Sequence, residues 1–188
     1  SHGVSPAYAA KIYRRYGEDA IAIVSQNPYR LADDVYGIGF KTADKIAGEV
    51  GVDKESPHRI GAGIKYWLGK ASEEGHCYSE EGKFASSVAH ELGVSEHLVT
   101  SGIAALEGAG EVCREGQSAL YLAPFYHAER GVARRLCQLA HARMWTLDSL
   151  SDEELAQVQA RAGIRLADQQ RAAVVKAFQT GVMVMTGG

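Results

Sequence analysis

Cysteine is scarce in this sequence, and long hydrophobic runs are missing. The three cysteines are an odd number, and the spacings of Cys77, Cys113 and Cys137 fit neither a zinc site nor a disulfide framework. We therefore expect no metal site built from cysteine, and reduced thiols as in a cytoplasmic protein. No apolar run approaches the roughly 20 residues that cross a bilayer, so we expect no membrane partner.

The sequence also has no overall excess of positive charge. The 20 Lys and Arg are outnumbered by 23 Asp and Glu, so the formal net charge is −3. Residues 71–130 hold three basic and ten acidic side chains, whereas residues 1–70 hold ten basic and eight acidic ones. This distribution excludes a protein that binds nucleic acid with a broad basic face. Any such contact has to be local, at loops and helix ends.

The remaining composition is that of a globular protein that is mainly α-helical. A hydrophobic fraction of 46% and a charged fraction of 23% exclude a disordered chain, a collagen and a coiled-coil rod. Apolar periodicity and capping residues predict helices at 7–16, 20–24, 40–50, 57–74, 83–92, 129–144 and 168–179, with others starting at Asn27, Ser95 and Ser151. Alternating patterns predict strands at 111–114 and 119–122, and a buried strand at 182–185.

The sharpest local signal is a Gly-hydrophobic-Gly turn, Gly37-Ile38-Gly39, followed by the helix that begins near Phe40. Glycines allow a tight turn and let a phosphate approach the backbone. The free N–H groups at the start of the following helix then face the anion, with the helix dipole behind them. Lys41 and Thr42 can add side-chain contacts, while Ile38 anchors the turn. Such contacts read no bases, so binding is expected to be independent of DNA sequence.

This pattern resembles the helix-hairpin-helix motif, with Ala43 as its small residue. A weaker copy lies upstream, where Gly3 and Ser5 precede Pro6, Ala9 and Ile12 like the back half of a second hairpin whose first helix is missing. Ser5 stands where the motif has its second glycine. The hairpins could also form only a scaffold or a contact with a protein partner, and both alternatives remain open.

A second signal lies near the C-terminal end. Gln170 follows Leu166 by four residues and precedes the apolar segment that runs into Thr186-Gly187-Gly188. This order resembles the start of the motor core of superfamily 1 helicases, where the glutamine binds adenine and the strand enters the phosphate-binding loop. The resemblance implies nucleotide contacts by Gln170, Thr186, Gly187 and Gly188. The loop's second Gly, its Lys and its Ser/Thr are absent here, so we expect this chain alone to bind neither ATP nor Mg²⁺ and to have no catalytic residues.

Together the motifs resemble RecD/TraA-type helicases, in particular the stand-alone RecD-like branch with an N-terminal extension. The resemblance implies a tandem helix-hairpin-helix domain at 1–74, a winged-helix-like α+β section at 75–126, a linking helix at 127–150, and the first helix and strand of an α/β RecA-like motor domain at 151–188. We therefore expect a piece of a longer protein. The family's activity is ATP- and Mg²⁺-dependent 5′→3′ translocation on single-stranded DNA with unwinding at single-strand/duplex junctions.

The alternative from another class is a non-enzymatic module that binds DNA or a protein through its hairpins. A third possibility, a base-excision glycosylase, requires a catalytic Asp roughly 18 residues after the hairpin lysine. That position is occupied by Arg59, and the nearest Asp, Asp53, lies only 12 residues after Lys41.

Overall fold

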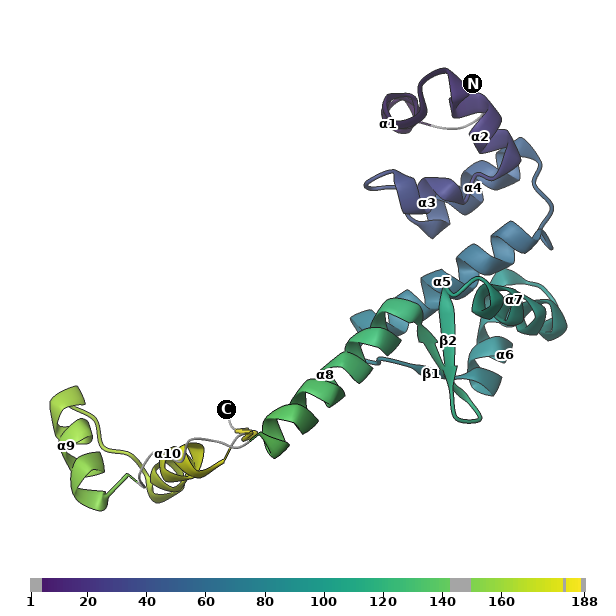
Figure 1. Cartoon of the computed structure of the whole chain (residues 1–188). Coiled ribbons are helices and arrows are strands. Elements are labelled where there is room, and N and C mark those ends of the chain that lie inside the picture. The colour runs from purple at the N-terminus through teal and green to yellow at the C-terminus, as the bar shows by residue number, and fades with distance from the viewer. Residues whose placement is uncertain (1–4, 143–149, 181, 187–188) are drawn as a thin grey trace. The chain divides into compact units, whose positions relative to one another are not determined.

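The computed structural model describes residues 5–142, 150–180 and 182–186. The chain divides into two compact units, 1–127 and 128–188. Figure 1 shows the helices of the first unit and its small sheet. These elements are α1 (Pro6–Tyr16), a 3₁₀ turn (Gly17–Asp19), α2 (Ala20–Gln26), α3 (Arg30–Asp34), α4 (Phe40–Val50), α5 (Pro57–Glu73), β1 (Ser79–Glu80), α6 (Glu81–Leu92), α7 (Glu96–Gly108), β2 (Val112–Glu115) and β3 (Ala119–Leu122).

Helices α1 and α4 begin and end within one residue of the predicted positions, whereas α2 ends two residues later than predicted and α3 begins at Arg30 instead of at Asn27. Ser5 is the N-cap of α1, and its Oγ accepts a hydrogen bond from the Tyr8 N–H at 3.4 Å. Gly51 ends α4 in the left-handed conformation, with φ +86°. This conformation is costly for residues with a Cβ, so glycine at this position fixes the end of the helix.

The following section contains two helices and a three-stranded antiparallel sheet of order β1-β3-β2. In β3, Leu120 pairs with Arg114 of β2 and with Ser79 of β1. The predicted helix–helix–hairpin order is present. The short strand β1 was not predicted, because two residues are too few to show an alternating pattern. The assignment as a winged helix and the predicted domain boundaries stay predictions.

One core of buried apolar side chains runs from α1 to β3. Helix α5 lies within this core, and two glycines allow close packing around it. A Cβ on Gly63 would lie 2.8 Å from a methyl carbon of Leu92, and a Cβ on Gly102 would lie 2.7 Å from a methyl carbon of Ile60. Helix α5 is therefore closely packed against α6 and α7, and it also contacts the hairpin helix α4.

The last helix of the first unit, α8 (Ala123–His141), continues into the second unit. It begins six residues earlier than the predicted start at 129. The helix follows β3 without a loop, and the Ala123 N–H donates to the Glu111 carbonyl at 3.0 Å. Pro124, which has no N–H, fits the first turn of a helix.

The second unit also contains α9 (Asp152–Ala162) and α10 (Asp168–Gln179). Ser151 and Glu154 form the predicted capping box at the start of α9. The predicted strand at 182–185 is wrong for this structure: residues 182–186 have no regular secondary structure, and Val184 and Met185 are exposed. A strand needs a hydrogen-bonded neighbour, and none of the described residues pairs with this segment.

No helix among the described residues is both long and apolar enough to cross a bilayer. In the same part of the chain, no group of three or more His, Cys, Asp or Glu side chains is arranged to hold a metal ion.

Candidate nucleic-acid interface

The hairpin consists of α3, a tight turn and α4. The Ile38 N–H donates to the Val35 carbonyl at 3.0 Å and closes a four-residue turn. Gly37 occupies the third position of this turn with φ +85°, a conformation that favours glycine. Val35 and Ile38 are buried in the core. The turn is therefore anchored on both sides, with Tyr36 and Gly37 between the anchors.

The N-terminus of α4 lacks a side-chain cap. Gly39 is its N-cap residue, in extended conformation, and its carbonyl accepts the N–H groups of Thr42 and Ala43 at 3.1 and 3.0 Å. Among the described residues, no acceptor is found for the N–H groups of Phe40 and Lys41. Two donors at the positive end of an 11-residue helix are thus available to an anion.

Two lysines lie close to this turn. The exposed Lys41 is in the first turn of α4. Lys11, on α1, donates from Nζ to the Tyr36 carbonyl at 3.2 Å. The sequence did not indicate Lys11, which is 25 residues from Tyr36 in the chain, and its place at the hairpin is a result of tertiary packing.

A polar cluster supports α4 from the side of α5. Asp44 accepts hydrogen bonds from the Tyr29 hydroxyl at 2.7 Å and from Arg59 Nε at 2.8 Å, both at Oδ1. Burial acts to raise the pKa of Asp44, but the hydrogen bonds from Arg59 and Tyr29 and the charge of Arg59 outweigh it, so this pKa is lowered. Burial and the hydrogen bond to Asp44 raise the pKa of Tyr29. Asp44 is therefore an ionised structural partner of Arg59.

The upstream half-hairpin differs from this site. Gly3 lies outside the described residues. The Ser5 hydroxyl is engaged with the Tyr8 N–H, so one donor at the start of α1 already has a partner within the chain. The predicted anion site at α4 thus has two backbone donors without a partner among the described residues, whereas one donor at the start of α1 is already used.

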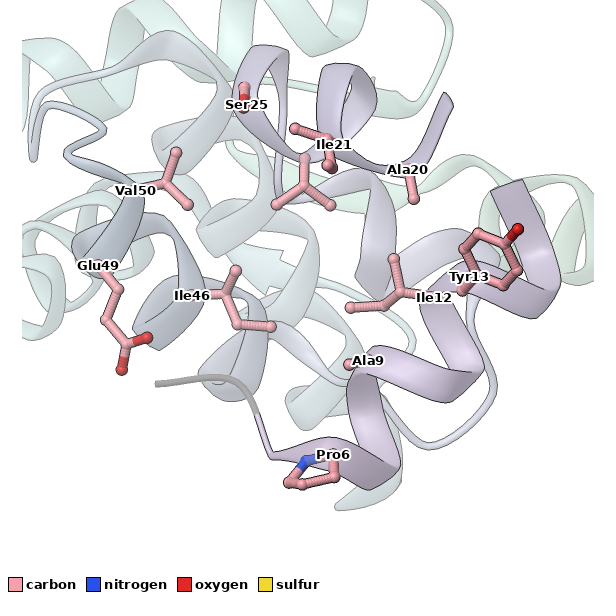
Figure 2. A pocket seen from close by; sticks show the side chains of 11 residues that line it. Pro6, Ala9, Ile12, Tyr13, Ala20, Ile21, Ser25, Ile46, Glu49 and Val50 are labelled. Atoms are coloured by element: carbon pink, nitrogen blue, oxygen red, sulfur yellow. The ribbon is translucent and has the colours of Figure 1, made fainter. Parts of the chain in front are cut away.

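An apolar groove of about 660 Å³ lies between α1, α2 and α4. Figure 2 shows Ala9, Ile12 and Ile46 directed into this groove. Ala9 and Ile12 occupy the positions in α1 that correspond to Ala43 and Ile46 in α4, counted from Ser5 and Gly39. The lining residues include Glu49 but no cation, so the groove is unsuited to phosphate.

The residues predicted to contact a nucleotide are only partly described. The Ala167 N–H donates to Oε1 of Gln170 at 2.9 Å, which holds the side-chain amide at the start of α10. The oxygen retains a second lone pair and the NH₂ group two donors, as adenine binding requires. Thr186 is exposed. Gly187 and Gly188 lie outside the described residues.

The paired helices and their glycine turn define a helix-hairpin-helix domain. In agreement with this, residues 1–78 match the family model described as ATP-dependent RecD2 DNA helicase HHH domain. This match supports a RecD2-type helicase N-terminal region at residues 1–78, in agreement with the sequence resemblance. The matched segment includes the turn, Lys11, Lys41 and the Asp44–Arg59 pair.

Proposed function

We propose that residues 1–78 bind the DNA backbone through the α3–α4 hairpin, independently of base sequence. The observation that carries this proposal is the start of α4, where a glycine N-cap leaves the Phe40 and Lys41 N–H groups available beside a lysine side chain. A phosphate accepts such donors and gains from the helix dipole. The family match supports DNA as the source of that phosphate.

The wider proposal is that this chain is the accessory, DNA-binding part of an ATP-dependent helicase. In the proposed activity the enzyme translocates 5′→3′ on single-stranded DNA and opens the duplex at a junction. The nucleotide contacts of Gln170, Thr186, Gly187 and Gly188 belong to this proposal, as do ATP and Mg²⁺ as its cofactors. The cytoplasmic location stays a prediction. Sequencing the coding region beyond Gly188 tests the motor assignment, which requires a Lys followed by Ser or Thr within the next few codons.

The hairpin site can be tested at Gly39 without disturbing the fold. A Cβ at this position meets no atom within 4 Å, and its φ of −94° is allowed for any residue. Asp and Asn are both good N-cap residues. Gly39→Asp and Gly39→Asn should therefore both keep or slightly raise the free energy of unfolding.

The two variants should differ in DNA affinity. The carboxylate of Gly39→Asp occupies the anion site and repels phosphate, so affinity for single-stranded and duplex DNA should fall at least tenfold. Gly39→Asn adds nearly the same volume without charge and should lose much less. Fluorescence anisotropy with a labelled oligonucleotide at low salt measures both. Equal affinity for the wild-type protein and Gly39→Asp, with both folded, would leave the hairpin as a scaffold or a protein contact.

A further inference from the structure

The tip of the hairpin displays one aromatic ring. Tyr36 is 97% exposed, more than any other large hydrophobic residue in the described part of the chain. Its neighbours Val35 and Ile38 are 7% and 2% exposed. The Tyr36 ring therefore lies in solvent, while the side chains of Val35 and Ile38 on either side of it are buried in the core.

The backbone that carries this ring is restricted by two hydrogen bonds and by the conformation of one glycine. The hydrogen bond from the Ile38 N–H to the Val35 carbonyl closes the turn, and the left-handed Gly37 sets its direction. Lys11 Nζ donates to the carbonyl of Tyr36 itself at 3.2 Å. Binding through the ring then costs little backbone entropy, because the turn is already ordered.

Tyr36 also lies next to the proposed phosphate site. It is the second residue of the turn, and Gly39, the N-cap of α4, directly follows the turn's last residue. A phosphate at the start of α4 places the attached nucleotide near the tip of the hairpin. Aromatic rings stack on bases irrespective of base identity, which fits a backbone-directed site.

We infer that Tyr36 stacks on an unpaired base of the strand whose phosphate the α4 N-terminus holds, so that the hairpin prefers single-stranded DNA to duplex. This inference rests on the proposed function of the hairpin. The preference follows because bases in a duplex are already stacked, and separating them costs free energy. In a single strand the face of a base is accessible.

The experiment compares the full chain with Tyr36→Leu and Tyr36→Phe on three probes: a labelled oligo(dT) strand, a strand of the same length made of abasic residues, and a duplex. Tyr36→Leu keeps an apolar side chain but has no ring, and should bind oligo(dT) about 5- to 100-fold more weakly. Tyr36→Phe keeps the ring and should stay within about twofold of wild type. On the abasic strand and the duplex, all three proteins should bind alike.

The outcomes separate this inference from the hairpin function. Equal weakening of Tyr36→Leu on oligo(dT), abasic strand and duplex, or no weakening on oligo(dT), overturns base stacking while phosphate binding at Gly39 stands. Absence of wild-type binding to every probe overturns both. Because Tyr36 is exposed, the urea midpoint of Tyr36→Leu should equal that of wild type, which confirms that the variant is folded.

Discussion

Arg59 Nε donates to Asp44 Oδ1 at 2.8 Å, and the Nη1 of the same guanidinium donates to the Leu92 carbonyl at 2.9 Å. One side chain on α5 thus joins the hairpin helix α4 to the end of α6. The Arg59 side chain is only 13% exposed, so these bonds are partly shielded from water. A base-excision glycosylase would require a catalytic Asp at position 59, where this protein has the arginine of this structural contact.

We predict that Arg59→Leu lowers the free energy of unfolding by about 2–4 kcal/mol, because Asp44 and the Leu92 carbonyl lose their partner. The free energy of unfolding of Arg59→Lys should lie between those of wild type and Arg59→Leu, since lysine keeps the charge but loses the forked geometry of the guanidinium. Urea denaturation followed by circular dichroism measures the change. As a control, Lys83→Leu breaks the exposed pair with Glu80 and should leave the urea midpoint unchanged. A similar loss in both variants would mean that the Arg59 contacts are no stronger than a surface pair.

A second prediction concerns pH. The pKa of Asp44 is lowered in the folded protein, so the ionised carboxylate stabilises the fold at pH values above its unfolded pKa of about 3.9. This contribution is lost as the pH falls through the folded pKa. The gap in urea midpoint between wild type and Asp44→Asn should therefore be largest near pH 6 and should narrow below about pH 4. A gap that stays constant down to pH 3 would show that the charge is not its source.

A third prediction concerns salt. The hairpin offers few donors, so it should contact about two to four phosphates, with a log–log salt slope of about −0.9 per phosphate on duplex DNA. Lys41→Gln should weaken binding uniformly across sequences and reduce the slope by about 1. Lys83→Gln, within the acidic segment 71–130, is the matched control and should change neither the DNA affinity nor the salt slope. A steep wild-type slope would instead indicate a broad basic surface elsewhere.

A fourth prediction concerns ATP. Residues 182–188 contain no lysine, so a polypeptide of residues 1–188 alone should show no ATP turnover above buffer, with or without single-stranded DNA. A coupled phosphate-release assay measures this. Gln170→Ala should also be inactive, yet it should loosen the start of α10 because the Ala167 N–H loses its acceptor. Measurable turnover by residues 1–188 would contradict the proposal that ATP hydrolysis needs a further lysine followed by Ser or Thr.

The sequence by itself determined the local elements of this protein. Ser5-Pro6, Gly37-Ile38-Gly39 and Gly51 predicted where α1 and α4 begin or end, because capping and left-handed positions depend on neighbouring residues alone. The resemblance drawn from the same residues agrees with the family match at 1–78. The sequence did not predict β1, which is too short to carry a periodic signal.

Only the tertiary structure decided which distant side chains meet at the hairpin. Lys11 reaches the Tyr36 carbonyl across 25 residues, and Arg59 reaches Asp44 across 15. No periodicity along the chain encodes these contacts, because they arise from the packing of α1 and α5 around the hairpin. The apolar segment at 182–185 shows the same dependence: its side chains favour a strand, but a strand forms only where another one supplies hydrogen bonds.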